Sequence, residues 1–168
     1  MKEIKLSQGY VAIVDDEDYE RVAKYNWHAV IQHRLDLSTR VYAARGIRKA
    51  DGKFVKGYLH RLISGTPEGM DTDHINGDSL DNRRCNLRSC TTAENARNRP
   101  RRISSESRFK GVSRVRGYDR WRAYIKRDGV KKHIGYFDSE EDAARAYNNY
   151  AVLLHGEFSR INAIAEVE

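Results

Sequence analysis

The chain has 168 residues, 39% of them hydrophobic, which is enough for one or two packed domains and argues against global disorder. Its two cysteines are too few for a disulfide framework or a four-cysteine zinc site, and no apolar run is long enough to cross a membrane. The formal net charge is +7, and residues 97–135 contain 14 Lys and Arg against 3 Asp and Glu, whereas the rest contains 17 against 21. Such a local surplus of cations is typical of a nucleic-acid-binding surface.

No signal peptide is recognisable, so we expect a cytoplasmic protein with reduced thiols. Free cysteines are usually buried, and we expect both Cys85 and Cys90 to be small core residues. Neither a membrane partner nor a small-molecule substrate is indicated.

Residues 1–66 are predicted to form short strands and one helix. In DDEDYERVAKYNW, residues 15–27, acidic residues precede apolar residues at near-helical spacing, which predicts the helix. RVYAARGIRKADGKFVKGYLHRLI, residues 40–63, predicts two strands joined around Asp51-Gly52, a favoured hairpin turn. No catalytic chemistry is recognisable in this segment, and it is interpreted as scaffold.

The stretch DTDHINGDSLDNRRCNLR, residues 71–88, begins a group of residues from which a metal site can be built. Asp73 adjoins the imidazole of His74, and Asn86 and Asn95 follow 12 and 21 residues beyond His74. Carboxylate and amide oxygens suit Mg²⁺, and an imidazole with an ordinary pKa near 6.5 suits proton abstraction from water. Because neighbouring residues of a strand point to opposite faces, a bulge or turn is needed to aim Asp73 and His74 the same way.

The same residues also have an ordinary interpretation. An Asp-His pair is most often a surface pair, the Asn-Gly-Asp and Asp-Asn stretches are common turns, and Asn86 could simply pin a loop. Beyond them, TTAEN predicts a helix start, with Thr91 as N-cap, Glu94 completing a capping box and Asn95 in the first turn.

LHRLISGTPEGMDTDHINGDSLDNRRCNLRSCTTAENARNR, residues 59–99, closely resembles the HNH homing endonuclease family of phages and mobile introns. The match is continuous over about 40 residues and includes His60 in HRLI. The resemblance implies a ββα-metal fold that cuts DNA with one divalent ion. By position, it makes Asp73 and Asn95 the metal ligands and His74 the general base, with Asn86 holding the hairpin and orienting His74.

The chain departs from the broad HNH pattern because no histidine follows Asn95 on the helix. The resulting site is rich in oxygen ligands and poor in imidazole, which favours Mg²⁺ or Mn²⁺ over tightly held zinc or nickel.

The C-terminal segment begins with a basic, flexible linker, ARNRPRRISSESR. In RWRAYIKR, Trp121, Ala123 and Ile125 alternate with Arg122, Tyr124 and Lys126, which predicts a strand with one apolar and one cationic face. The segment that follows predicts a hairpin turn at Asp128-Gly129, a second strand, and a helix capped by Asp138 or Ser139 and ended by Gly156. The expected packing stripe of this helix is Ala143, Tyr147, Tyr150, Ala151 and Leu154.

Residues 108–162 resemble an AP2 DNA-binding domain through GV, the W.A.I strand, IGYFDSEEDAARAYN and G.FSRIN. The resemblance implies that a three-stranded sheet lies in the DNA major groove with one helix behind it. Ser113, Val115 and His133 differ from the base-reading residues of plant AP2 domains, so no sequence preference carries over. The expected DNA-binding residues are Arg97, Arg99, Arg101, Arg102, Lys110, Arg114, Arg116, Arg120, Arg122, Tyr124, Lys126, Lys131 and His133.

These expectations describe an α+β chain. A ββα-metal (His-Me finger) nuclease core with a mixed β N-terminal part is followed by a three-stranded antiparallel sheet with one helix. The expected boundaries are residues 1–98 for the nuclease domain (core 58–98), 99–106 for the basic linker and 107–168 for the AP2-like domain.

The expected function is that of a phage- or mobile-element-encoded homing endonuclease in a bacterial host cell. It would use one Mg²⁺ or Mn²⁺ ion per site, bind double-stranded DNA as a monomer and nick one strand. The alternative is a DNA-binding regulator whose HNH module is catalytically silent.

Overall fold

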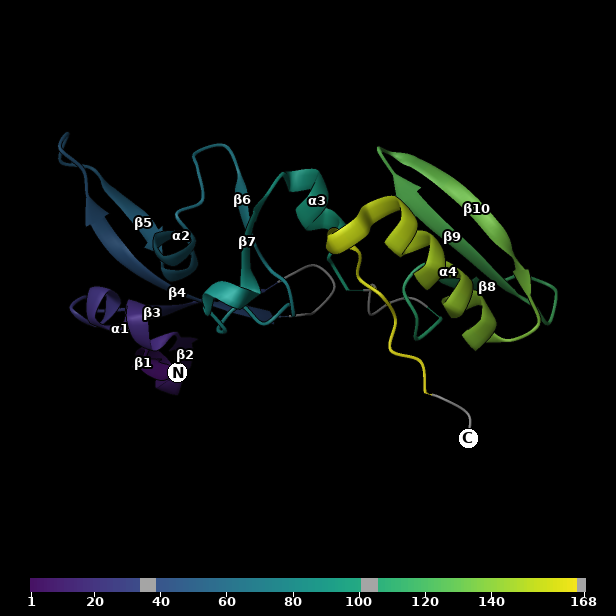
Figure 1. Ribbon diagram of the computed structural model, residues 1–168, viewed down its shortest axis with the longest axis horizontal. Helices are drawn as coiled ribbons and strands as arrows, with labels where there is room; N and C mark the ends of the chain where they lie inside the picture. The colour runs from purple at the N-terminus through teal and green to yellow at the C-terminus, as the bar shows by residue number, and fades with distance from the viewer. Residues whose placement is uncertain (34–38, 101–105, 166–168) are drawn as a thin grey trace. The chain divides into compact units, whose positions relative to one another are not determined.

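The computed structural model describes residues 1–33, 39–100 and 106–165 (Figure 1). The chain divides into two compact units, Met1–Thr92 and Ala93–Glu168. Within the described residues the strands form four small antiparallel sheets, accompanied by short helices, so the predicted α+β class is confirmed. No helix among these residues is both long and apolar enough to span a membrane.

The first unit contains a two-stranded sheet, a three-stranded sheet and a second two-stranded sheet that belongs to the candidate site. Its elements are β1 (Lys2–Lys5), β2 (Val11–Val14), α1 (Asp16–Ala23), β3 (His28–His33), β4 (Thr39–Arg48), β5 (Phe54–Tyr58), α2 (Leu59–Ser64), β6 (Asp71–His74) and β7 (Leu87–Cys90). The helix predicted near residues 15–27 is confirmed as α1, and the predicted hairpin joins β4 to β5, with Gly52 at a φ of 80° in its turn.

One face of the sheet ordered β3-β4-β5 packs on the core of this unit. Ala29 and Ala43 are paired across β3 and β4 and are 8% and 1% exposed, because the small side chains let other elements approach closely. The residues packed with them include Ile4, Leu6, Val14, Val22, Trp27, Leu59 and Ile63.

Two expectations for this unit are wrong. The strand predicted to run to residue 63 ends at Tyr58, because Leu59 and Ile63, four residues apart, enter the core together as one face of α2. Gly65, at a φ of 63°, ends that helix. Cys90 is buried as expected, but Cys85 is exposed, because it lies in a single 3-10 turn, Arg84–Asn86, at the surface.

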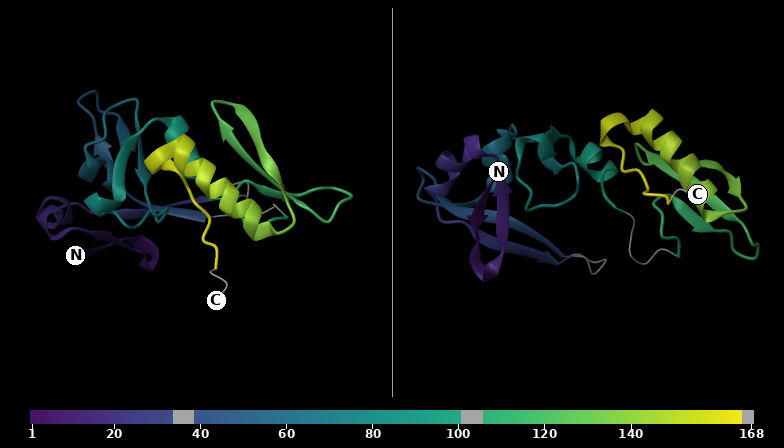
Figure 2. Two further views of the ribbon diagram at one scale, coloured as in Figure 1. Left: turned by 45° about the vertical axis from the view of Figure 1, so that its right-hand side comes forward. Right: turned by 60° about the horizontal axis from the view of Figure 1, so that its bottom comes forward.

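The second unit contains α3 (Thr92–Arg97), whose first residue belongs to the first unit, followed by β8 (Val112–Arg114), β9 (Trp121–Arg127), β10 (Val130–Phe137) and α4 (Glu140–His155). The antiparallel sheet has the order β10-β9-β8, and α4 runs across one face of it (Figure 2). The hairpin turn at Asp128-Gly129 is confirmed, with φ values of 49° and 84°. Ser139, rather than Asp138, caps α4 by accepting a hydrogen bond from the Asp142 amide, and Gly156 ends the helix.

The predicted alternation in β9 is also confirmed. Ala123 and Ile125 are buried against α4, where Ala143, Tyr147 and Ala151 form the centre of the packing stripe. Tyr150 and Leu154 are half-buried at its edge.

Gly111 explains part of the GV motif that precedes β8. It has a φ of 75°, and a Cβ atom there would come within 2.1 Å of the Tyr147 ring and 2.7 Å of the Tyr124 carbonyl oxygen. Only glycine therefore lets the chain pass between β9 and α4 at this point.

Candidate active site and candidate nucleic-acid interface

The hairpin of β6 and β7 holds the two residues at the centre of the candidate active site. Asp73 is paired with Arg88 and His74 with Leu87, and Asp73 and His74 are each only 5% exposed. His74 is the last residue of β6, and its carbonyl oxygen accepts a hydrogen bond of 2.9 Å from the Gly77 amide. The expected turn therefore starts directly at His74.

Asp73 forms a buried ion pair with Arg88. Oδ2 accepts hydrogen bonds of 2.9 Å and 2.6 Å from Nε and Nη2 of Arg88, whose side chain is 12% exposed. A buried carboxylate needs such compensation for the water that it loses. Sequence reasoning did not identify Arg88 as its partner.

The imidazole of His74 lies among aromatic rings. Its ring centroid is 5.2 Å from that of His60, with the planes at 79°, and 6.3 Å from that of Tyr42. Tyr58 stacks on His60 at 5.3 Å, and Tyr42 also meets His60 edge-on at 5.6 Å. These rings keep bulk water from much of the His74 surface, so the site is mainly apolar on this side.

Burial lowers the pKa of His74 below its ordinary value of 6.5. A hydrogen bond with Asn82 and the charge of Asp73 oppose this shift without cancelling it. More weakly, the charge of Arg40 lowers the pKa and that of Asp78 raises it. The imidazole is therefore neutral near pH 7, the form that can accept a proton from water.

Asn86 braces the turn that follows His74. Its Oδ1 accepts a hydrogen bond of 2.9 Å from the Asn76 amide, and its Nδ2 donates one of 2.8 Å to the Asp81 carbonyl oxygen. The Asn86 carbonyl oxygen also accepts a hydrogen bond of 2.9 Å from the Ile75 amide. These contacts support the role expected of Asn86, which is to hold the hairpin.

The N-terminal elements hold the other end of the same loop. The Ile13 amide donates to Leu80, and the Ile13 carbonyl oxygen accepts from the Asn82 amide, both at 2.8 Å. Asp18, 1% exposed on α1, accepts hydrogen bonds of 2.7 Å and 2.8 Å from Nε and Nη2 of Arg84. The first residues of the chain are thus part of the support for the candidate site, beyond the scaffold role expected of them.

The predicted metal ligands lie in different units, Asp73 in the first and Asn95, half-buried on α3, in the second. Within the part of the chain that the structure describes, no three His, Cys, Asp or Glu side chains gather to hold a metal ion. That observation does not bear on the predicted pair, which consists of one carboxylate and one amide. Oxygen donors of this kind fit a hard divalent ion such as Mg²⁺.

The candidate DNA-binding surface is the face of the β10-β9-β8 sheet that α4 leaves open. Arg122, Tyr124 and Lys126 alternate with the buried residues of β9 and therefore share this face. Tyr124 is paired with His133 and Lys126 with Lys131, which places both partners on the same face. The Lys131 ammonium lies 3.5 Å from the centroid of the Tyr124 ring, a cation–π contact.

The register of β8 with β9 shows that Arg114 does not lie on this face. Arg114 is paired with Trp121 and Val112 with the buried Ala123, so Arg114 lies on the side that α4 covers, where it is exposed at the end of β8. Arg99, Arg116 and Arg120 are exposed, and Arg120 pairs with Asp138 at 3.0 Å. Arg101 and Arg102 lie outside the described residues.

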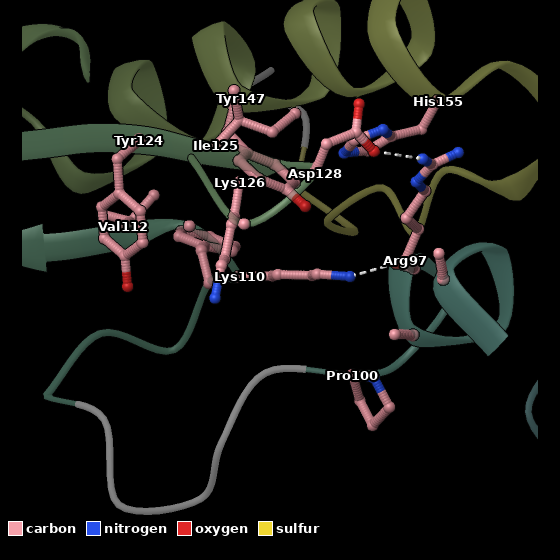
Figure 3. Close-up of a pocket in the computed structure, with 15 residues that line it drawn as sticks. Arg97, Pro100, Lys110, Val112, Tyr124, Ile125, Lys126, Asp128, Tyr147 and His155 are labelled. Carbon is pink, nitrogen blue, oxygen red and sulfur yellow. Dashed lines mark hydrogen bonds and ion pairs between the residues drawn. The ribbon is translucent and has the colours of Figure 1, made fainter. Parts of the chain in front are cut away.

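Two other predicted contact residues line a pocket of about 550 Å³ within the second unit (Figure 3). Lys110 reaches the C-terminal end of α3, where its ammonium donates hydrogen bonds to the carbonyl oxygens of Arg97 and Arg99. Burial, and then the charge of Arg160, lower the pKa of Lys110 to about 8. The Arg97 guanidinium pairs with Asp128 at 3.2 Å. In this arrangement both cations hold α3 and its neighbours together.

Sequence reasoning gave no role to His60 or Tyr42, which form the wall beside His74, nor to Tyr136 on the open sheet face. Tyr136 is paired with Arg122 and is 52% exposed. Simple alternation along β10 could not show which face Tyr136 occupies, because the register shifts between His133 and Gly135.

Residues 58–97 match the model of the HNH endonuclease family, a span that includes both members of the Asp73-His74 pair. The chain is 28% identical over 163 residues to an uncharacterized HNH endonuclease of Acanthamoeba polyphaga mimivirus, covering 94% of this chain and 77% of that protein. It is 32% identical over 94 residues to protein 3.8 of Escherichia phage T7, covering 56% of this chain and 77% of that protein. No solved structure matches the chain.

Proposed function

Because the chain belongs to the HNH endonuclease family, we propose that it hydrolyses a phosphodiester bond of double-stranded DNA, with His74 as general base. One observation carries the proposal. The matched segment buries the imidazole of His74 at the end of β6, in the residue that follows Asp73, and burial lowers the pKa of that imidazole.

In the proposed reaction, His74 takes a proton from a water molecule as the water oxygen forms a bond to phosphorus. The bond from phosphorus to the leaving sugar oxygen breaks, and that oxygen acquires a proton from solvent. Asn86 holds the turn that follows His74 and so fixes the end of the strand that carries the base. The rings of His60 and Tyr42 hold the imidazole by packing.

Asp73 and Asn95 are proposed to hold one Mg²⁺ or Mn²⁺ ion, which suits their oxygen donors. When bound, such an ion supplies positive charge for the phosphate and the leaving oxygen. Arg88, which donates to Oδ2 of Asp73, fixes the orientation of that carboxylate.

The second unit is proposed to bind DNA in the manner of an AP2 domain. Its open sheet face carries Arg122, Tyr124, Lys126, Lys131 and His133, and a surface of cations and aromatic rings complements the phosphate backbone. The two units differ from one another, so the chain is proposed to act as a monomer that nicks one strand. A homing role in the cytoplasm of the host cell is part of the same proposal and is supported by the viral origin of the relatives.

A supercoiled plasmid tests the proposal. Mg²⁺ or Mn²⁺ should support conversion to the relaxed circle, and a chelator should stop it. Direct conversion to the linear form would contradict nicking. If the plasmid stays supercoiled with either ion while DNA is still bound, the chain is instead the DNA-binding regulator with a silent HNH module.

A further inference from the structure

The β3-β4-β5 sheet has a second face, opposite the core, whose composition is unusual. The three strands together contain Arg40, Arg45, Arg48 and Lys56 and no Asp or Glu. Arg45 belongs to the core face, where its guanidinium stacks on the Tyr25 ring at 3.7 Å from the centroid. Arg40 and Arg48 lie on the opposite face, because they are five and three positions from Arg45 along β4. Lys56 joins them through its pairing with Gly46 on the same face.

The register of β4 with β5 extends this face with aromatic rings. Arg48 is paired with Phe54 and Gly46 with Lys56, and the Arg48 guanidinium lies 6.0 Å from the centroid of the Phe54 ring. Arg48 and Lys56 are exposed, and Phe54 is 74% exposed. Two cations and one aromatic ring are therefore exposed together on this face.

The same face leads into the candidate active site. Tyr42 follows Arg40 by two residues on β4 and lies beside His74, at 6.3 Å between ring centroids. Tyr58, paired with Ala44, stacks on His60. The surface defined by Arg40, Tyr42, Arg48, Phe54 and Lys56 is called here the basic-aromatic face. Tyr42 borders the proposed general base, and Ala44, between Tyr42 and Arg48 on the same face, is buried.

We propose that the basic-aromatic face binds the phosphate backbone of the DNA duplex next to the bond that is cut. The proposal rests on the proposed nuclease function, because it assumes that the DNA is cut beside His74. The distance is appropriate: six residues from Tyr42 to Arg48 span about 20 Å at roughly 3.3 Å each. That length corresponds to the axial rise of about six base pairs, so the face can follow one stretch of backbone from the cleavage point.

Binding is tested with the full chain carrying His74→Ala and a duplex of 30 base pairs of mixed sequence, between 50 and 200 mM salt. Each lost phosphate contact should reduce the slope of log K against log salt by about 0.9. We expect Arg48→Gln with Lys56→Gln to reduce it by about 1.8. The matched control is Lys5→Gln with Lys24→Gln, which removes the same charge from exposed positions on other elements of the first unit.

The control should leave the slope unchanged. The charge-conserving pair Arg48→Lys with Lys56→Arg should also show the slope of the chain with the natural residues at both positions. Equal slopes for the glutamine pair and the control would refute the proposal, because the basic-aromatic face would then be a solvated surface. In the chain that retains His74, the glutamine pair should raise KM for the plasmid and spare kcat. A plasmid left intact by the unaltered chain refutes the nuclease function instead, and the slopes alone then decide whether this face binds DNA.

Discussion

The rings of His60 and His74 form a T-shaped contact, with a centroid distance of 5.2 Å and an interplanar angle of 79°. Burial, followed by the charges of His74 and Arg61, lowers the pKa of His60 to about 3, so this imidazole is neutral at physiological pH. Near pH 7 the uncharged His60 ring therefore affects His74 only by packing against it and by excluding water.

We expect His60→Phe to keep most of the cleavage activity and His60→Ala to lose it, because phenylalanine can fill the space beside His74 and alanine cannot. The measurement is the initial rate of plasmid nicking at saturating DNA. Equal loss in the two variants would show that a ring nitrogen of His60, rather than its packing, is required.

His74→Ala should abolish cleavage and leave DNA affinity nearly unchanged, because the side chain is buried and its proposed role is proton transfer. Nicking and duplex binding are measured on the same preparation. Residual cleavage at the normal rate, or loss of binding alone, would contradict the role of general base.

Asn86→Ala should destabilise the first unit as well as reduce cleavage. The substitution leaves the Asn76 amide and the buried Asp81 carbonyl oxygen without their side-chain partners, at a cost of about 1–3 kcal/mol. Urea unfolding followed by circular dichroism measures this cost. A stability equal to that of the natural sequence would show that Asn86 does not brace the turn.

Stability should fall in acid partly through Asp18. Burial alone would raise its pKa, but hydrogen bonds and charges from Arg84 and Arg21 outweigh it and hold the pKa below the ordinary 3.8. A carboxyl with a depressed pKa contributes stability above the unfolded value, and this is lost as the pH falls through 3.8 toward the folded pKa. Asp18→Asn should therefore lower the urea midpoint at pH 7 but much less at pH 3. Glu20→Gln, at an exposed position of α1, is the control and should change neither.

Neighbouring lysines of β10 provide a matched test of the second unit. Lys131 lies over Tyr124 on the open sheet face, whereas the Lys132 ammonium lies 5.2 Å from the Tyr150 ring of α4. Lys131→Gln should reduce the salt-dependence slope of duplex binding by about 0.9, and Lys132→Gln should not change it. The opposite order would place DNA on the helical side of the unit.

Local sequence patterns predicted those elements whose burial follows a simple period. Alternation in β9 identified its two faces correctly, because the central strand of a sheet with one covered face buries every second residue. The same reasoning failed at Leu59 and Ile63, since an apolar stretch of this length fits a strand or a helix, and the choice depends on the core that receives it.

The candidate site was only partly predictable for a related reason. Asp73 and His74 could be identified from a motif, but Arg88, 15 residues from Asp73, becomes its partner only through the register of β6 with β7. His60 meets His74 because α2 packs beside that hairpin, a relationship that spacing along the chain does not reveal.

The contacts between β2 and the loop before β7 limit how this chain can be shortened. The Ile13 backbone bonds to Leu80 and Asn82, and Asp18 holds Arg84, although the family match begins only at residue 58. A protein engineer who grafts the matched segment alone onto another DNA-binding protein would leave that loop without its contacts to Ile13 and Asp18. A segment meant to keep the proposed cleavage activity should therefore include the chain from β1, which pairs with β2, onward.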